Sequence, residues 1–296
     1  MSSSAIAPSS PLTRQSWLWR GHSIAYTFEG SGTPVMLLHG FGASIGHWRK
    51  NIPVLAEAGY QVYAIDLLGF GASDKPAIDY SLELWEAMLV DFWQDKIQQP
   101  TVWVGNSIGA LLVLMLLAHH PELGRAGALL NAAGGLNHRP EELNLPLRVV
   151  MGTFAKVVNS KVLGPFMFNR VRQKSRIRGT LKQVYCDNAA VTDELVDLLY
   201  EPSCDPNAYK VFAAILAAPP GPRPTELLPQ VTQPLRVIWG AADPWTPISG
   251  SKPYQELAAA EPGRVQFTPL AQTGHCPHDE RPEAVNSLLL DWLAQV

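Results

Sequence analysis

The chain has 296 residues, of which 47% are hydrophobic and 17% are charged, and its net charge is −3. This composition is typical of a globular protein with a sizeable core, in one large or two small domains, and it excludes a disordered chain. The net charge argues against a general nucleic-acid-binding protein, and three cysteines without a C-x-x-C pair indicate reduced thiols.

The first part of the chain predicts alternating strands and helices after a Ser-rich leader. Residues 1–15 lack the apolar core of a secretory signal, so we expect a disordered leader or the remnant of a targeting segment, and a protein that is not secreted. The elements then predicted are a hairpin over 17–28, a buried strand over 34–38, a helix over 48–58, a strand over 61–65 and a helix over 81–97.

Residues 101–118 predict a strand, a sharp turn and a buried helix. The turn carries G-N-S-I-G at 105–109. In this setting G-x-S-x-G is a nucleophile elbow, a strained turn that exposes a serine hydroxyl beside the first helical amides, although the motif alone also occurs in ordinary turns. The run has no charge, but it falls short of the roughly 20 apolar residues of a membrane span, so a buried strand and helix are favoured.

The second part of the chain interrupts and then resumes this alternation. A strand over 126–130 is followed by helical patterns, and the rhythm returns with strands over 235–240 and 264–268 and helices over 253–260 and 282–295. Strands alternating with helices indicate a parallel sheet. We therefore predict an α/β-hydrolase type of fold, a mostly parallel twisted sheet flanked by helices. Residues 16–135 and 225–296 form its core, and 136–224 form a helical lid inserted at the carboxyl edge of the sheet, where such sheets bind ligands.

Three residues predict a serine nucleophile with its base and acid. A serine hydroxyl is a weak nucleophile until a base accepts its proton, and the base needs an acid to orient it. Ser107 lies in the elbow, Asp243 follows the strand over 235–240, and His275 follows the last strand. This chain order is that of elbow-type hydrolases, so we predict a catalytic triad. Asn131 also follows a strand, but an amide cannot replace the carboxylate.

Two backbone amides are predicted to form an oxyanion hole, which needs two donors aimed at one point. One is the amide of Ile108, directly after the nucleophile, and the other is that of Phe41, in the loop after the strand over 34–38. His39 in the same loop is expected to be structural or to line the pocket rather than to react.

Other motifs predict no metal and no cofactor. His275 and His278 flank Cys276 without a second ligand pair, which is weak evidence for a metal site. We expect Cys276 to pack as a small apolar residue, and His278 to lie at the surface or pocket rim at the start of the last helix. The G-x-G sequences at 40–42 and 69–71 lack the third glycine of a dinucleotide-binding fingerprint, and there is no P-loop.

Together these motifs resemble the α/β-hydrolase superfamily over nearly all of residues 15–296. The resemblance is carried by His39-Gly40-Phe41-Gly42, by Asp66 with the G-x-G-x-S that ends at Ser73, by the Ser107 elbow, by Gly240 with Asp243, and by Gly274-His275 with Pro277. It implies ester hydrolysis through an acylated Ser107 as the default chemistry. A serine at this position argues against haloalkane dehalogenases and epoxide hydrolases, which use aspartate there.

The predicted lid is both basic and apolar. Residues 144–186 contain no acid, and their basic residues are Arg148, Lys156, Lys161, Arg170, Arg172, Lys174, Arg176, Arg178 and Lys182. A solvated helix face over a core stripe is one interpretation. The other is an apolar mouth with a basic collar, suited to a lipophilic ester or an anionic membrane surface. Our candidates for the substrate pocket are His39, Phe154, Phe166, Met167 and Trp245.

The lid also resembles pheophytinases and the related chlorophyll dephytylases, which cleave the phytyl ester of a tetrapyrrole. The matches are Q-V-Y at 183–185, V-T-D-E-L-V at 191–196, A-A-P-P-G-P at 217–222 and D-P-W-T-P at 243–247. The family elbow often ends in two glycines, where this chain has Gly109-Ala110 and so keeps a small residue. The resemblance implies dephytylation of chlorophyll or pheophytin, and a protein in the cytoplasm or peripherally on thylakoid membranes.

Two other functions stay open. Carbon–carbon bond hydrolases of ring-cleavage products share a G-N-S-x-G elbow and the same triad, but they often have an aromatic residue where this chain has Cys276. The other is a hydrolase-fold receptor or scaffold with little turnover. Scaffolds usually lack part of the triad, whereas receptors can keep it.

Overall fold

One mixed sheet organises the part of the chain that the computed structural model describes, residues 13–137, 139, 158, 160 and 163–296. Its strand order is β1-β2-β4-β3-β5-β6-β7-β8. β2 pairs antiparallel with β1 and β4, and the other neighbours are parallel, so the predicted fold class is confirmed. The strands are β1 (Gln15–Trp19), β2 (His22–Glu29), β3 (Thr33–Leu38), β4 (Tyr60–Ile65), β5 (Thr101–Asn106), β6 (Gly124–Leu130), β7 (Leu235–Gly240) and β8 (Val265–Leu270).

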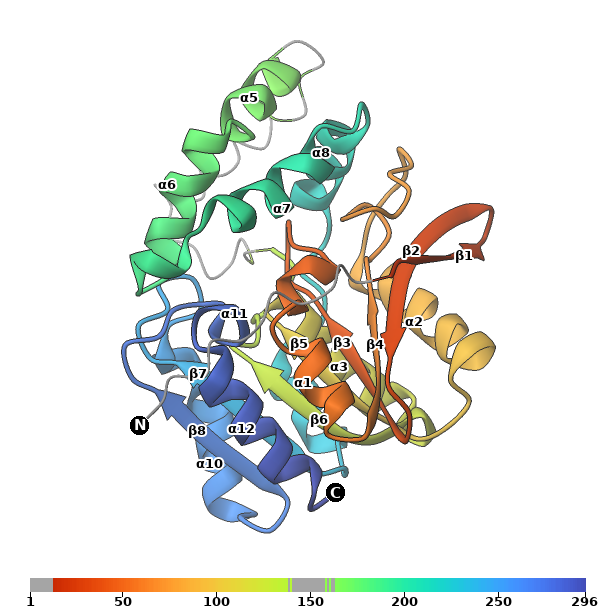
Figure 1. Ribbon diagram of the computed structural model, residues 1–296, viewed down its shortest axis with the longest axis vertical. Helices are drawn as coiled ribbons and strands as arrows, with labels where there is room; N and C mark the ends of the chain where they lie inside the picture. The colour runs from red at the N-terminus through yellow and green to blue at the C-terminus, as the bar shows by residue number, and fades with distance from the viewer. Residues whose placement is uncertain (1–12, 138, 140–157, 159, 161–162) are drawn as a thin grey trace.

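Helices cover both faces of this sheet (Figure 1). The helices are α1 (Ile52–Glu57), α2 (Leu82–Lys96), α3 (Ile108–His119), α5 (Leu163–Val171), α6 (Lys174–Val184), α7 (Asp193–Ser203), α8 (Ala208–Ala217), α9 (Pro224–Leu227), α10 (Lys252–Ala260), α11 (Pro277–Glu280) and α12 (Pro282–Leu293). Short 3₁₀ helices span Ile45–Trp48, Pro121–Leu123, Asn188–Ala190, Leu228–Gln230 and Ile248–Ser251. Because side chains alternate along a strand, Met36 and Leu38 of β3 join the core with α2 and α3, whereas Val35 and Leu37 join the core with α1 and α12.

The apolar run after the elbow forms α3, and its residues Ile108 to Leu117 are all buried. α3 lies between the sheet, where it contacts β5 and β6, and the helices α2 and α9. Burial on all sides explains why this helix has no polar face. In the described ranges no helix is both long enough and apolar enough to span a bilayer.

Helices α5 to α8 lie together at one end of the molecule, beyond the edge of the sheet (Figure 1). Their contacts with the connection between β3 and α1 include the following two. Leu198 of α7 packs so closely on Gly46 that a Cβ added there would lie 2.6 Å from its Cδ2, and the ring of Phe212 in α8 lies 6.2 Å from that of Phe41. Part of the segment predicted as a lid is outside the described residues, so its limits at 136 and 224 stay a prediction.

Two local predictions were wrong. The helix expected over 48–58 is a 3₁₀ helix (Ile45–Trp48) followed by α1, because Pro53 is tolerated only in the first turn of an α-helix and α1 begins beside it. His278 is neither at the surface nor in the last helix. It lies in the separate helix α11 with no exposed surface, and its ring packs on that of Trp48 at a centroid distance of 4.1 Å.

Candidate active site

Ser107 occupies a strained turn between β5 and α3. Its φ of 57° and ψ of −119° are unusual for a residue with a side chain. The two flanking glycines allow the turn to pack closely. A methyl group at Gly105 would lie 2.3 Å from the carbonyl carbon of Gly109, and one at Gly109 would lie 2.4 Å from the carbonyl oxygen of Leu38. The elbow geometry therefore depends on both glycines.

Asp243 and His275 form a buried pair at the ends of β7 and β8. Nδ1 of His275 lies 2.6 Å from Oδ2 of Asp243, and the two side chains are 5% and 0% exposed. A carboxylate can only accept, so Nδ1 carries the proton and Nε2 has a lone pair for a second proton. The ring is thus in the tautomer that a general base for a hydroxyl requires.

Other donors also hold the Asp243 carboxylate. Its Oδ1 accepts from the backbone amides of Trp245 (2.7 Å) and Thr246 (3.1 Å), and its Oδ2 accepts from the Thr246 hydroxyl and from Nδ2 of Asn131 (2.7 Å). Burial alone would raise the pKa of Asp243, but the hydrogen bond and charge of His275 and the bonds from Thr246 outweigh it and lower that pKa. The acid therefore stays ionised inside the protein.

The backbone of His275 is held on both sides. Its carbonyl accepts from Nδ2 of Asn106 at 2.9 Å, and Asn106 is the residue before the nucleophile. Its amide donates to the carbonyl of Val184, at the end of α6, at 3.0 Å. The structure thus brings the loop of the predicted base against the nucleophile turn on one side and against the α5–α8 segment on the other.

The loop after β3 also approaches the elbow. A Cβ added at Gly40 would lie 3.1 Å from Cβ of Ser107. Phe41 is the next residue in the sequence. Ile108 is the first residue of α3, where an amide has no acceptor within its helix. Across the described residues, neither of these two amides donates to another group. The loop that carries the Phe41 amide is therefore in contact with the elbow at Gly40, and the assignment of the two amides to an oxyanion hole stays a prediction.

His39 has a structural position. The ring is fully buried, Nδ1 lies 2.7 Å from the carbonyl of Gly40, and Nε2 lies 3.0 Å from the amide of Leu67. Nε2 therefore accepts, Nδ1 donates, and both ring nitrogens are occupied by backbone. Burial lowers the pKa of His39, which keeps the ring neutral. This position fits the structural role expected for His39, and the ring is not part of the lining of the cavity described next.

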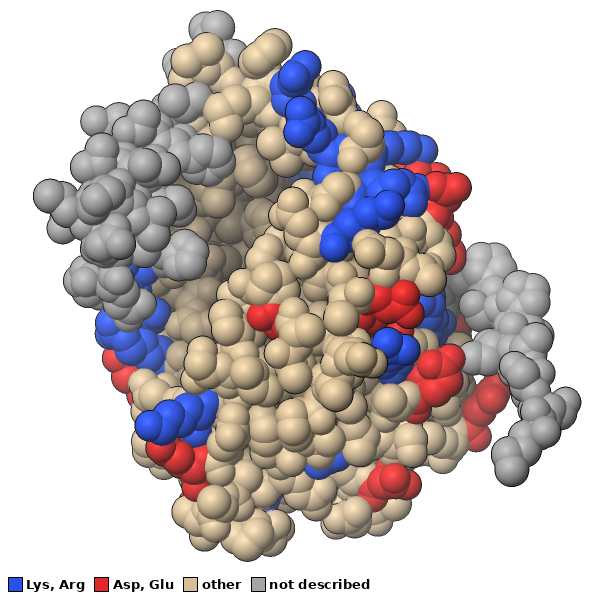
Figure 2. Space-filling model, turned by 90° about the vertical axis from the view of Figure 1, so that its left-hand side faces the viewer, with Lys and Arg blue, Asp and Glu red and all other residues tan. Residues whose placement is uncertain are grey.

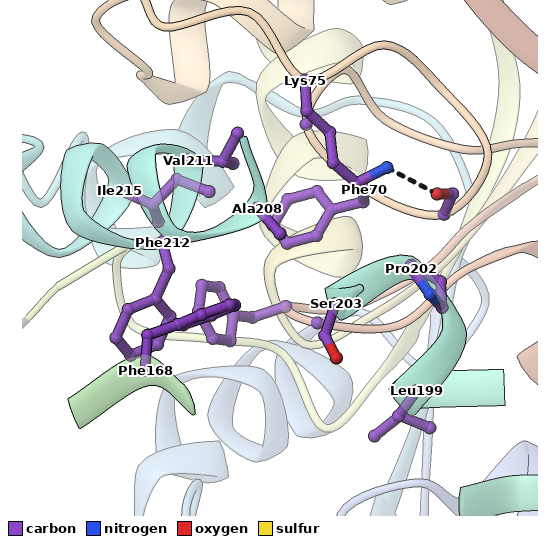
Figure 3. Close-up of a pocket in the computed structure, with 14 residues that line it drawn as sticks. Phe70, Lys75, Phe168, Leu199, Pro202, Ser203, Ala208, Val211, Phe212 and Ile215 are labelled. Carbon is purple, nitrogen blue, oxygen red and sulfur yellow. Dashed lines mark hydrogen bonds between the residues drawn. The ribbon is translucent and has the colours of Figure 1, made fainter. Parts of the chain in front are cut away.

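A cavity of about 110 Å³ lies between this loop and the α5–α8 segment (Figure 3). It is lined by Phe41, Gly42, Gly69, Phe70, Gly71, Lys75, Phe168, Leu199, Pro202, Ser203, Ala208, Val211, Phe212 and Ile215. Phe41 of this lining directly follows Gly40, which approaches the elbow, and the Phe41 ring lies 5.7 Å from that of Phe70. Lys75 is the charged residue of this lining, and its Nζ donates to the carbonyls of Gly71 (2.7 Å) and Ser73 (3.1 Å).

The predicted pocket residues Phe166 and Met167 do not line this cavity. Phe166 is 65% exposed and Met167 is half-buried, whereas their neighbour Phe168 faces inward and packs on Phe212 at 5.4 Å. Composition alone did not reveal which face of α5 is inside. Trp245 is exposed but lies 5.5 Å from the ring of His275, and Phe154 lies outside the described residues.

Cys276 is buried next to His275. Burial raises the pKa of its thiol, so it stays protonated and unreactive. Among the described residues, no group of three or more His, Cys, Asp or Glu side chains is arranged to hold a metal ion.

Sheet order, elbow turn and helical segment define the α/β-hydrolase class of fold. Residues 35–288 match the alpha/beta hydrolase family, and the chain belongs to that family. It is therefore a hydrolase with an α/β fold, and the resemblance that the motifs indicated is confirmed.

Similar proteins differ in what they act on. Chloroplastic pheophytinase of Arabidopsis thaliana is 28% identical over 88% of this chain, which spans only 60% of that relative's length. The 2-hydroxymuconate semialdehyde hydrolase of Pseudomonas sp. (strain CF600) is 30% identical over 90% of this chain and 89% of its own. The solved structure of a bacterial membrane phospholipase A is 25% identical, with a TM-score of 0.75 over 96% of this chain and 86% of its own.

Proposed function

We propose that this chain is a serine ester hydrolase that acts on a bulky lipophilic ester, of the kind formed by the phytyl group of chlorophyll or pheophytin. The observation that supports the proposal is the buried Asp243–His275 pair, whose loop accepts a hydrogen bond from Asn106, the residue before the elbow serine. Nε2 of His275 accepts the proton of Ser107 while the hydroxyl attacks the ester carbonyl, and the amides of Ile108 and Phe41 bind the oxyanion. His275 then protonates the leaving alcohol, and water attacks the acylated serine with His275 as base.

The lining of the cavity favours a neutral ester over an anionic substrate, because its charged residue, Lys75, is already bonded to the protein. The relatives that cleave ring-cleavage products are named for acids, such as 2-hydroxy-6-oxo-2,4-heptadienoate hydrolase. A carboxylate in an apolar cavity needs a cationic partner. The Lys75 ammonium already donates to two carbonyls, and burial lowers its pKa, so it is poorly placed to pair with a substrate. The aromatic lining supports binding of hydrocarbon instead.

Carbon–carbon bond hydrolysis is the second candidate. It is favoured by the 30% identity to 2-hydroxymuconate semialdehyde hydrolase, which this chain matches over 89% of that relative's length. The same three residues would serve that reaction, so the triad does not separate the two. The substrate panel below does.

The test is product analysis on chlorophyll, pheophytin, simple acyl esters and a ring-cleavage dienoate, with wild type and Ser107→Ala. We expect release of phytol and an acyl-enzyme burst from a chromogenic ester, both absent in the variant. Turnover of simple esters without release of phytol would reject the pigment but keep the esterase. Faster cleavage of the dienoate would reject the ester proposal, and binding of any of these compounds without turnover would indicate a receptor.

We further propose that α5 contacts an anionic membrane surface. Its inner face packs through Phe168, but its outer face exposes Leu163 (52%), Phe166 (65%) and Val171 (50%) to solvent. Lys and Arg side chains gather on the same side of the molecule (Figure 2). Those of α5 and α6 that have no ion-pair partner among the described residues are Arg170, Arg176 and Lys182. Exposed apolar side chains with flanking cations are the features that bind a lipid interface.

Sedimentation with lipid vesicles tests this contact. Phosphatidylcholine vesicles that contain an anionic lipid are expected to carry down the wild type, and added salt should release it. Phe166→Ser should weaken binding, whereas Leu18→Ser serves as the control because Leu18 is 72% exposed on β1, at the far side of the molecule (Figure 1). Equal binding of the two variants, or dimer formation that Phe166→Ser abolishes, would reject the membrane contact.

A further inference from the structure

We propose that Glu280 is a positioning residue that couples the end of helix α6 to the loop carrying His275. The Glu280 carboxylate is 6% exposed and accepts two backbone amides. Oε2 accepts from Gly274, the residue before His275, at 2.7 Å, and Oε1 accepts from Asp187, just beyond α6, at 2.8 Å. One carboxylate therefore joins two segments that are far apart in the sequence. The inference rests on the proposed role of His275 as the base.

The two segments are in direct contact as well. A Cβ added at Gly274 would lie 2.1 Å from the carbonyl oxygen of Val184 and 2.9 Å from Oε2 of Glu280. That same Val184 carbonyl accepts the amide of His275 at 3.0 Å. The end of α6 thus packs against the histidine loop, and the Glu280 carboxylate accepts one backbone amide from each of the two segments.

A second acid of α11 fixes the same end of α6 to the core. The hydroxyl of Tyr185 donates to Oδ2 of Asp279 at 2.9 Å, and both side chains are buried. Oδ1 of Asp279 is paired with Arg49 at 2.8 Å and with Lys50 at 3.0 Å, on the segment before α1. Because Asp279 holds the end of α6 to the core, that end is a fixed support for the histidine loop, which Glu280 and Val184 connect to it.

Glutamine is the informative substitution at position 280. It keeps the size of glutamate, but it has one acceptor oxygen, and its NH₂ group would face a backbone amide that also donates. It therefore breaks one of the two bonds without leaving a cavity. Burial raises the pKa of Glu280 despite the amides that its carboxylate accepts, which means that the fold disfavours the ionised form. Removal of the negative charge by itself should therefore add little to the loss of folding free energy in Glu280→Gln.

The experiment compares Glu280→Gln with Glu86→Gln in steady-state hydrolysis of a chromogenic ester. Glu86 is a matched control, since it is 8% exposed and accepts from His119 at 2.7 Å, at the end of α3 opposite the elbow. We expect Glu280→Gln to lower kcat about tenfold, the effect of losing roughly one hydrogen bond to a charged group, with KM nearly unchanged. Glu86→Gln should leave both kcat and KM unchanged.

A spectroscopic signature separates positioning from general destabilisation. The Nδ1 proton between His275 and Asp243 should give an NMR resonance far downfield of the amides. We expect this resonance to move upfield or broaden in Glu280→Gln and to persist in Glu86→Gln. An unchanged resonance and kcat in a folded Glu280→Gln would overturn the inference. So would a rise in KM alone, which would assign Glu280 to substrate binding.

A backbone variant tests the same link if Glu280→Gln does not fold. Asp187→Pro removes the amide that Glu280 accepts, at a φ of −91° that lies near the range of proline, and Asp187→Ala removes only the side chain, which accepts from the Ala189 amide. We expect Asp187→Pro alone to lower kcat, and equal activity of the two variants would reject the link. Absence of acylation in the wild type would instead reject the proposed function.

Discussion

Asn131 gives the sharpest test of the proposed acid–base pair. Its side chain donates to Oδ2 of Asp243 at 2.7 Å and accepts the amide of Gly240 at 2.8 Å. Asn131→Ala removes one bond to a charged group, about 1.5–3 kcal/mol, and one neutral bond, about 1 kcal/mol, so the free energy of unfolding should fall by roughly 2.5–4 kcal/mol. If the lost hydrogen bond to Asp243, about 1.5–3 kcal/mol, also raises the free energy of the transition state by that amount, kcat falls about 10- to 150-fold.

Urea unfolding and ester hydrolysis measure the two effects separately. Asn286→Ala is the control, because Asn286 is also buried and makes two hydrogen bonds away from the pair: it accepts from Asn51 and donates to the carbonyl of Lys50. It should lose stability but keep kcat. A normal kcat in Asn131→Ala despite a stability loss would refute the reasoning, because it would mean that the geometry of Asp243 does not matter to the base.

Three further predictions concern the elbow, the acid and the cavity. Gly109→Ala places a methyl group 2.4 Å from a backbone oxygen and should abolish soluble expression or lower the melting temperature sharply, as measured by thermal unfolding. The pKa of Asp243 is lowered in the fold, so its contribution to stability is present above an unfolded pKa of about 3.9 and lost as pH falls through the folded value. Asp243→Asn should therefore reduce the acid sensitivity of urea unfolding. Phe212→Ala removes a ring in contact with Phe41 and Phe168, and should raise KM for a bulky ester more than for acetate esters; equal changes would argue against this cavity as the binding site.

The strands and the order of the candidate triad could be predicted because each depends on local patterns. Buried strands are short apolar runs, and β7 was predicted with the bounds that the structure has, Leu235–Gly240. The supporting groups could not be predicted, because their partners are far away in sequence. Asn131 was considered only as a substitute for the acid, whereas it donates to that acid. Glu280 accepts two backbone amides, which leave no trace in the sequence.

His278 was misplaced for a related reason. A histidine in a polar stretch before a helix is usually exposed. Here His278 belongs to the short helix α11, and its ring packs against the rings of Trp48 and His47. The inner face of α5 was missed because apolar residues occupy both faces of that helix, so periodicity does not show which face packs.

The candidate site follows the order of the strands across the sheet. Ser107 comes after β5, Asn131 after β6, Asp243 after β7 and His275 after β8, and these four strands are neighbours in that order. Side chains from three of these strand ends are bonded in turn along this edge: Asn131 donates to Asp243, and Asp243 accepts from His275. Because neighbouring parallel strands hold one another in register, the sheet fixes the spacing of these residues. A shift of one residue in β6 or β7 would move a side chain by about 3.3 Å, more than a hydrogen bond tolerates. Changes in the surrounding helices should therefore be tolerated where changes to these strands are not. The exceptions are the first turn of α3, where Gly109 packs on β3, and helices α6 and α11, which touch the histidine loop directly.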